Sequence, residues 1–442
     1  MKIAGLRWAT AGFAAAALLA TSACSSGLGG GSAGGGSSSG GAGSQTLTLL
    51  VDNGPSTVKA AEAITAAFEK ANPGVDVKYQ TRPQGTEGDN LVKTKLSTGD
   101  MEDVFWYNSG SLLQALNPAQ TLVDLTGDPA IAQVDETFLP AVTQGGKVYG
   151  VPQGSSFGGG ILYNRDVYSK LGLQVPKTWA EFEANNDKIK AAGGDITPVL
   201  ETFGETWTSQ LFVLGDFYNV QTANPNFAKD YTANKVKYAT DPAAVKGFQK
   251  LAEVKAKGYV NSDYGSLKYQ TGIKRLAQGK AAHYPLIASV VADLPKADQQ
   301  KIGFFGIPGD DAAKAGATVW LPGAGYAPKA GKNVDLAKKF LAFMASPEGV
   351  QAYSSAQLPT GPYLVKGATL PADAPPVASD LKTYLDAKKV APALEFLSPV
   401  KGPSLEQITV AVGTGQTPPE KGAAQYDQDV IKQAKQLGLP GW

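Results

Sequence analysis

The sequence predicts an α/β protein with an open parallel sheet that carries helices on both faces. Strand and helix patterns alternate between residues 46 and 107, and the first strand pattern is a continuous apolar run typical of a strand buried on both faces. Turn residues separate the segments. Strand, helix, strand, helix and strand within about seventy residues favours parallel βαβ units.

The expected elements of this first part can be given in order. A turn at 52–55 precedes the first helix, for which Ser56 is the expected N-cap. The sequence Asn72-Pro73-Gly74 is expected to end that helix. The strands are expected over 46–51, 75–79 and 103–107, and the later helices over 91–97 and 112–116.

Polar and aromatic residues follow these strands directly. In open α/β sheets, ligands bind beyond the carboxyl ends of the strands. Asn53, Arg82 and the turn that contains Trp106, Asn108 and Ser109 are therefore candidate site residues.

A second set of elements begins near residue 147. Strands are expected over 147–152, 158–164, 196–200, 301–307 and 318–327, and helices from about 177 and over 208–217, 242–257 and 334–345. Trp179 and Phe340 are expected to be core residues. No internal repeat of 20 to 50 residues is visible, which argues against a solenoid.

The N-terminus has the pattern of a secretory signal. Lys2 and Arg7 precede an apolar stretch at 8–20, which is too short to span about 30 Å of hydrocarbon. We expect a signal peptide over 1–23. No later run reaches 18 uncharged apolar residues, so the rest of the chain is not expected to be a membrane permease.

Cys24 is the only cysteine and follows small residues, and this segment resembles the lipobox of bacterial lipoproteins. Thr21 stands where that motif usually has Leu. The resemblance implies that Cys24 carries a lipid, and the alternative is an ordinary signal peptide with an incidental cysteine. Residues 25–44 are almost entirely Gly and Ser, so 24–44 is expected to be a lipidated, flexible tether at a membrane surface.

The composition excludes several classes of protein. The 40 Lys and Arg residues nearly balance 39 Asp and Glu residues, which argues against a nucleic-acid-binding protein. One Cys and one His exclude most multi-ligand metal sites, and no phosphate-binding loop is present. We therefore expect no cofactor and no metal.

Several stretches of the body resemble extracellular solute-binding proteins of family 1, the carbohydrate-binding lipoproteins that feed ABC importers. No single stretch is diagnostic, but their order and spacing run along essentially the whole body from Thr46 onward. The stretches are LSTGD at 96–100 with DVFW at 103–106, GKVYGVP at 146–152, LYNRD at 162–166 with LGL at 171–173, PKTW at 176–179, LAQGKAA at 276–282, and FLAFM at 340–344 with SPEG at 346–349.

The resemblance implies a type II periplasmic-binding-protein-like fold, with two α/β lobes joined by a three-crossing hinge and a ligand cleft between them. The crossings are expected near 154–157, 321–326 and 371–379. The N-terminal lobe is then expected over 45–154 and 323–375, and the C-terminal lobe over 155–322 and 376–442. Glycines gather beside these points, as hinge residues or as ordinary turns: Gly154, Gly158, Gly159, Gly160, Gly323 and Gly325.

A sugar needs flat aromatic surfaces together with fixed donors and acceptors. Trp106 is a stacking candidate because the corresponding family position is commonly one, and Glu205 and Trp207 lie in a loop rich in both chemistries. Trp320 and Tyr326 lie at the second crossing, and Phe157 lies at the first. His283, the sole histidine, and Tyr284 end a strand that faces the cleft in the family; a lone His is more often structural.

The sequence interpretation is a monomeric, non-enzymatic binder on the outer face of the cytoplasmic membrane, whose partners are a carbohydrate and the transmembrane permease subunits. Three alternatives stay open. The same fold could bind a peptide, a polyamine or a metal chelate. The run at 154–158 matches a nucleophile elbow, with Asp216 and His283 following, but the strand pattern after it does not fit a hydrolase. A glycosidase needs two carboxylates in the cleft, and Glu201 and Glu205 are the candidates for that pair.

Overall fold

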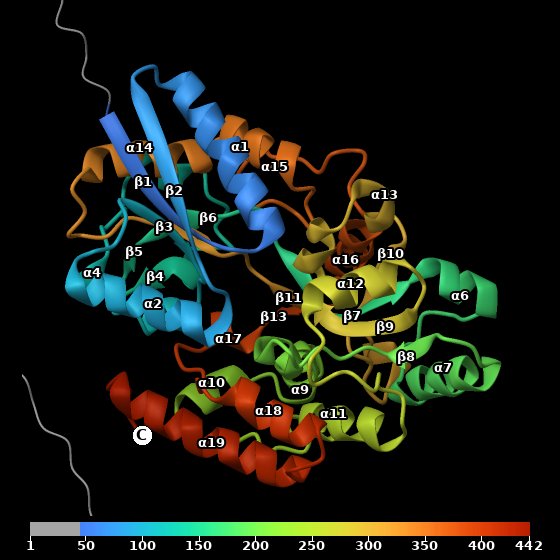
Figure 1. Ribbon diagram of the computed structural model, residues 1–442. Coiled ribbons are helices and arrows are strands. Elements are labelled where there is room, and N and C mark those ends of the chain that lie inside the picture. The colour runs from blue at the N-terminus through green and yellow to red at the C-terminus, as the bar shows by residue number, and fades with distance from the viewer. Residues whose placement is uncertain (1–44) are drawn as a thin grey trace, which may run out of the picture. The chain divides into compact units, whose positions relative to one another are not determined.

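The computed structural model describes residues 45–442, and Figure 1 shows their arrangement. The expected signal peptide over 1–23, the expected tether over 24–44 and Cys24 lie outside the described residues. Two large sheets organise the described chain, each with its own hydrophobic core. We call the elements around the first sheet the first lobe and those around the second sheet the second lobe.

The first sheet has five strands in the order β2-β1-β3-β12-β6. β1 pairs in parallel with β2 and β3, as the alternating pattern predicted. α1 packs against α15, and α14 packs against β6 and β12. The elements of the first lobe are β1 (Gln45–Asp52), α1 (Pro55–Ala71), β2 (Val75–Arg82), α2 (Gly85–Thr98), β3 (Val104–Tyr107), α3 (Ser111–Gln114), α4 (Pro118–Thr121), α5 (Pro129–Ala132), η1 (Leu139–Val142), β4 (Thr143–Gln144), β5 (Lys147–Val148), β6 (Gly150–Pro152), β12 (Ala324–Tyr326), α14 (Val334–Met344) and α15 (Pro347–Ala356).

The second sheet has six strands. Five follow the order β13-β11-β7-β9-β8, and β10 also pairs with β7. The elements of the second lobe are β7 (Phe157–Asn164), α6 (Arg165–Leu171), α7 (Trp179–Ala192), β8 (Thr197–Val199), η2 (Thr206–Gln210), α8 (Leu211–Gly215), α9 (Phe217–Ala223), α10 (Phe227–Thr232), α11 (Lys246–Ala256), α12 (Tyr269–Ala277), β9 (Ala281–Ile287), η3 (Ala288–Asp293), α13 (Lys296–Gln299), β10 (Ile302–Phe305), η4 (Ala312–Lys314), β11 (Ala317–Trp320), α16 (Pro376–Asp386), β13 (Val390–Pro392), α17 (Leu394–Leu397), α18 (Leu405–Gly413) and α19 (Pro419–Gln436).

Local sequence signals explain where several helices begin and end. Thr178 and Glu181 form a capping box at the start of α7, and Gly99 ends α2 in the left-handed conformation. Ser56 is not the N-cap of the first helix: Pro55 occupies the first turn, so α1 begins two residues earlier, with Gly54 at the cap position. Trp179 and Phe340 are buried, as expected for core residues.

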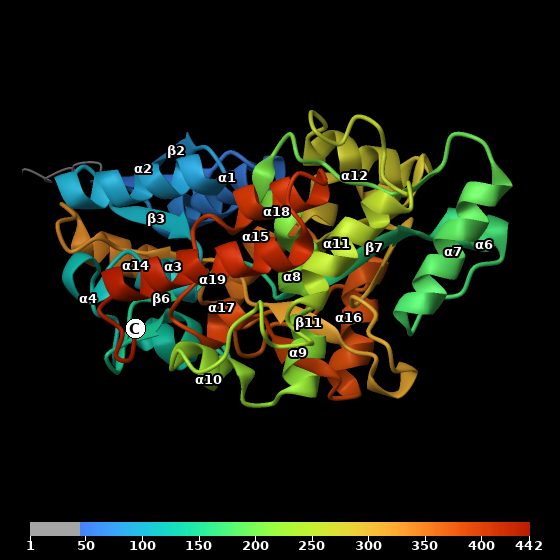
Figure 2. The same ribbon diagram turned by 90° about the horizontal axis from the view of Figure 1, so that it is seen from below.

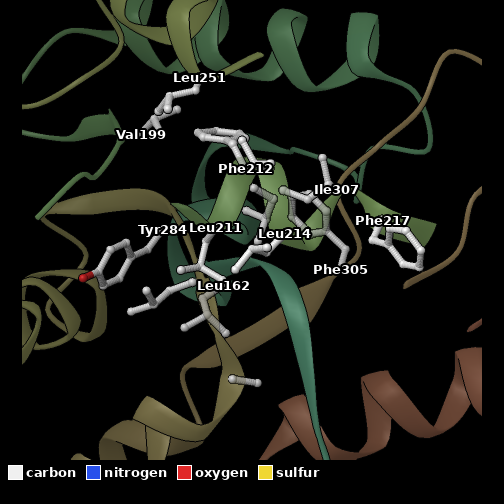
Figure 3. Close-up of a cluster of buried hydrophobic side chains, with 14 of the residues drawn as sticks. Leu162, Val199, Leu211, Phe212, Leu214, Phe217, Leu251, Tyr284, Phe305 and Ile307 are labelled. Carbon is white, nitrogen blue, oxygen red and sulfur yellow. The ribbon is translucent and has the colours of Figure 1, made fainter. Parts of the chain in front are cut away.

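The core of the second lobe lies around α8, between the second sheet and the helices that cover it. Figure 3 shows Leu211, Phe212 and Leu214 projecting from α8 among Leu162, Tyr284, Phe305 and other side chains. Phe212 is 1% exposed and Phe305 is fully buried. The corresponding core of the first lobe gathers Leu47, Leu49, Phe68, Phe105 and Phe340.

The chain passes between the two sheets three times. The passages run from β6 to β7, from β11 to β12 and from α15 to α16, which confirms the expected three-crossing, two-lobed architecture. The single strand expected over 318–327 is wrong: residues 321–323, which include Pro322 and Gly323, break it into β11 and β12, which belong to different sheets.

The glycines beside the first passage have different structural roles. Gly154 has φ +84°, in the region that favours glycine. Gly158, Gly159 and Gly160 lie inside β7, where other groups fill the space that a side chain would need: a Cβ on Gly158 would lie 2.3 Å from the Phe304 ring, and one on Gly159 would lie 1.9 Å from the Trp320 ring. In residues 45–442, no helix combines the length and the apolar character that a membrane crossing requires.

Candidate functional site

A cavity of about 390 Å³ lies between the two lobes, and both lobes contribute to its lining. This volume is within the range of small-molecule sites. The first-lobe wall consists of the carboxyl ends of β1, β2 and β3 and the helices that follow them. The second-lobe wall includes η2, α8, η3, the start of α12, the segments α17 and α18, and one end each of β7 and β11.

Strand register places the first-lobe side chains in a row. Asp52 at the end of β1 pairs with Arg82 at the end of β2, and Leu50 of β1 pairs with Phe105 of β3. Parallel strands that end together bring Asp52, Arg82 and Tyr107 to one edge of the sheet. That edge faces the cavity, as expected for an α/β sheet.

Arg82 is a buried cation in this wall, with 5% of its surface exposed. Its guanidinium donates to Pro83 O at 3.0 Å and to Trp106 O at 3.4 Å, and it lies 5.3 Å from the centre of the Tyr107 ring. Its Nε has no hydrogen-bond partner among the described residues. Burial raises the pKa of the nearby Asp89 carboxyl, and the positive charge of Arg82 opposes that shift.

Three tryptophans line the cavity in different ways. Trp106 is only 1% exposed and lies against Tyr353, whereas Trp207 is only partly buried. The indole N–H groups of both Trp106 and Trp207 lack a protein acceptor among the described residues. The Trp320 ring packs on the backbone of Gly159, which has no side chain, and the indole N–H donates to Glu395 Oε1.

Three carboxylates lie in the second-lobe wall, together with the cation of Lys401. Asp293 ends η3, Glu395 lies in α17 and Glu406 lies in the first turn of α18. Burial raises the pKa of Asp293, while its hydrogen bond with Ser56 opposes the shift. Tyr269 begins α12 beside Asp293, and burial raises its pKa as well.

The structure brings seven of the predicted site residues into the lining of this cavity. Ser109 also fixes the wall to the second crossing, because its hydroxyl donates to Pro322 O at 2.8 Å. The seven residues are Arg82, Trp106, Asn108, Ser109, Phe157, Trp207 and Trp320.

His283 and Tyr284 do not line the cavity, which corrects the expectation for both. They lie in β9, between β7 and β8, and both are fully buried. His283 Nε2 is 2.6 Å from the Tyr168 hydroxyl, and Tyr284 bonds to the Thr202 hydroxyl at 2.6 Å. Burial lowers the pKa of His283 to about 3.

Tyr326, Glu205 and Asn53 also lie outside the lining. Tyr326 is fully buried, and its hydroxyl donates to Asn108 O at 3.0 Å, so it supports the site loop from behind. Glu205 Oε2 accepts from the Tyr269 backbone N–H at 2.9 Å. Asn53 is exposed, and its backbone N–H donates to Arg82 O at 2.9 Å.

Several lining residues were missed by sequence reasoning. Asp52 directly follows the first strand pattern, so the rule that selected Asn53 could have selected it. Tyr269, Asp293 and Glu406 come from helix ends and short turns that are far apart in the sequence. No periodic pattern connects them to the site.

The alternatives with hydrolytic chemistry lack their geometry. The run at 154–158 leads from β6 into β7, not into the helix that a nucleophile elbow requires. Asp216 bonds to Lys250 and Asn219, while His283 bonds elsewhere. Glu201, like Glu205, does not line the cavity. Within residues 45–442 no group of His, Cys, Asp and Glu side chains has a metal-binding arrangement.

Comparisons with known proteins agree with the architecture. The profile of a family described as bacterial extracellular solute-binding protein matches residues 63–383. The multiple sugar-binding protein of Streptococcus mutans serotype c is 26% identical over 307 residues, which cover 68% of this chain and 70% of that protein. The melibiose/raffinose/stachyose-binding protein of Bacillus subtilis strain 168 is 25% identical over 347 residues, 74% of each chain. A solved chitin oligosaccharide binding protein shares the fold, with TM-score 0.75 and 24% identity over 89% of this chain and 99% of its own.

Proposed function

This chain belongs to the bacterial extracellular solute-binding protein family, and from that premise we propose that it captures a sugar or oligosaccharide outside the cytoplasmic membrane and delivers it to the permease of an ABC importer. Relatives named for multiple sugars and for melibiose, raffinose and stachyose support this ligand class. In this proposal the protein binds without catalysing a reaction.

The observation that carries the proposal is the combination of chemistries in the cavity. Aromatic rings of Trp207 and Trp320 supply apolar surface for the CH faces of a sugar ring. The N–H groups of Arg82 Nε and of the Trp106 and Trp207 indoles, which have no acceptor within residues 45–442, supply donors for hydroxyl oxygens. A buried donor without an acceptor is costly, so a ligand that supplies acceptors gains affinity there.

Both lobes contribute to the lining, so a bound sugar would contact both and favour their closed arrangement. We propose lobe boundaries after residues 154, 322 and 375, at the three passages between the sheets. We further propose that Cys24 is lipidated and that residues 24–44 tether a monomeric binder to the outer face of the membrane.

Ligand-induced stabilisation of the purified protein tests the ligand class. A ligand present at 100 times its Kd raises the free energy of unfolding by about 2.7 kcal/mol. We expect a clear thermal shift with at least one of melibiose, raffinose, stachyose, maltotriose and chitotriose. Peptides, polyamines and metal chelates in the same screen represent the other solutes that this fold could bind.

Calorimetry with the stabilising sugar then tests the aromatic surfaces. Trp207→Ala and Trp320→Ala should each weaken binding about tenfold or more, if stacking contributes ~1–3 kcal/mol as it does for nucleobases. Trp442→Ala is the control, because Trp442 packs against Tyr231 and is not part of the lining. Stabilisation by none of the sugars, or hydrolysis of a reporter glycoside or ester, would reject the proposed function.

A further inference from the structure

Two helices of the first lobe begin at the cavity without a side-chain cap of their own. α1 has Gly54 at its cap position and α2 has Gln84, and neither residue caps its helix through its side chain. The first N–H groups of a helix have no partner within the helix, and they carry a partial positive charge. Asp52 accepts from the Gly54 N–H at 2.8 Å, but Gly54 precedes the helix proper.

The second lobe supplies a partner for the start of α1. Asp293, which ends η3, accepts from the Ser56 backbone N–H at 2.9 Å. Ser56 is the second residue of α1, and this is one of the N–H groups that an N-cap side chain normally binds. Asp293 therefore caps α1 from the opposite wall of the cavity, 237 positions away in the sequence.

The start of α2 also binds a carboxylate of the second lobe, here through a side-chain hydroxyl. Glu406 in the first turn of α18 accepts from the Thr86 hydroxyl through one carboxylate oxygen, and from the Thr206 hydroxyl through the other. Thr86 is the second residue of α2, whereas Thr206 belongs to the second lobe. Figure 2 shows α18 beside α11 and α19 of the second lobe. The Glu406 carboxylate thus bonds to Thr206 of its own lobe and to Thr86 of the first lobe.

Backbone packing brings the same two walls together at a third point. Gly110 of the first lobe has φ +69°, and a Cβ there would lie 2.4 Å from Glu395 O in α17. The absence of a side chain at position 110 lets the two segments approach this closely. All three contacts join the lobes beside the cavity.

We propose that Asp293 and Glu406 form a latch that stabilises the closed arrangement of the lobes: Asp293 caps α1, and Glu406 binds the Thr86 hydroxyl at the start of α2, each from the opposite lobe. The inference goes beyond the proposed function, because the partners are protein groups and the contacts form whatever the ligand is. Opening the cavity separates each carboxylate from its helix and returns both groups to water. The apparent affinity for a ligand then falls in proportion to the fraction of molecules that is closed.

A distance measurement without any sugar tests the latch. Spin labels on Lys78→Cys in β2 and Lys188→Cys in α7, in the full chain with Cys24→Ser, report the separation of the lobes by pulsed electron paramagnetic resonance. Lys78 and Lys188 are exposed. We expect Asp293→Ala, Glu406→Ala and Thr86→Val each to shift the distances to longer values with a broader distribution. Asp386→Ala, in an exposed pair with Lys382 on α16, should leave them unchanged.

Each outcome either supports or overturns the latch. Thr86→Val removes one donor and leaves both carboxylates in place, so it answers the question even if an Ala variant unfolds. The proposal is overturned if the distances do not change in any of the three variants. It is also overturned if the parent protein is as open as the variants. Residues that only contact the ligand would change sugar affinity without changing these sugar-free distances. Because no sugar is present, the result is independent of whether the proposed ligand class is correct.

Discussion

The two lobes have similar layers but bury different chemistry. The core of the first lobe is apolar, and its buried carboxylates have partners near its edge: Glu102 pairs with Lys95 at 2.8 Å, and Asp103 accepts from the Thr48 N–H at 2.9 Å. The second lobe buries ionisable groups deep in its core. They include Glu201, Asp216, Lys250 and His283.

This difference means that the lobes respond to different conditions. An apolar core loses stability when its packing is changed, and pH has little effect on it. A core that contains ionisable groups loses stability when a partner is removed or when a neutral group must take up charge. We therefore expect the second lobe to determine the pH range over which the protein stays folded.

The largest effect should come from breaking the buried ion pair of the second lobe. Lys250 Nζ lies 2.6 Å from Asp216 Oδ1 and also donates to Pro308 O at 2.8 Å. Lys250→Met leaves a buried carboxylate without its counter-charge, and we expect a loss of about 3–5 kcal/mol in the free energy of unfolding, measured with urea.

Two further variants sharpen this result. Lys95→Met in the first lobe removes a cation whose side chain is 23% exposed, so we expect a loss of only about 1 kcal/mol. Asp216→Leu combined with Lys250→Met should recover much of the stability, because an apolar pair needs no counter-charge. Equal losses for Lys250→Met and Lys95→Met would contradict the proposed difference between the lobes.

The next largest effect is the loss of stability that His283 causes at acidic pH. Its pKa is about 3 in the folded protein because of burial, and about 6.5 in the unfolded chain. Between these values the unfolded chain binds the extra proton, so stability falls as the pH falls below 6.5. From pH 7 to pH 5 the parent should lose about 2 kcal/mol more than His283→Gln, in urea unfolding at each pH. Parallel losses in the two proteins would show that His283 does not contribute.

The smallest effect concerns Glu201, and here the stability falls as the pH rises. Burial raises the pKa of this carboxyl, and its Oε1 has no partner among the described residues. When folding raises the pKa of a carboxyl, the protein loses stability as the pH rises above the pKa of that carboxyl in the unfolded chain, which is about 4.3. Glu201→Gln cannot ionise, so at pH 7 we expect it to be more stable than the parent by on the order of 1 kcal/mol. A variant that is less stable than the parent at both pH 5 and pH 8 would contradict this.

The sequence was most informative where the structure is regular. Apolar runs and turns located β1, β2 and β3, and the rule for parallel sheets then placed Arg82, Trp106, Asn108 and Ser109 at the cavity. His283 and Tyr284 were misplaced because β9 is covered on both faces, so even its polar residues are buried. A buried strand that contains His does not by itself show which residues reach a ligand.

The second-lobe wall was much harder to predict from the sequence. Trp207 was found because its loop is rich in polar and aromatic residues, but Asp293 and Glu406 lie at the end of one short helix and the start of another. Their position depends on how α18 and η3 pack, and that is a tertiary property. The division of 318–327 into two strands was likewise determined by which sheet each half could join.

The position of β12 has a consequence for the order in which the chain folds. This strand lies between β3 and β6, yet it follows all the second-lobe elements from β7 to β11 in the sequence. Because the chain is synthesised from its N-terminus, the first sheet lacks the strand between β3 and β6 until residue 326 has been made. Both β3 and β6 then have open edges, which attract other strands. The first lobe therefore cannot complete its sheet before most of the second has appeared, and a fragment that ends at residue 154 should aggregate instead of folding.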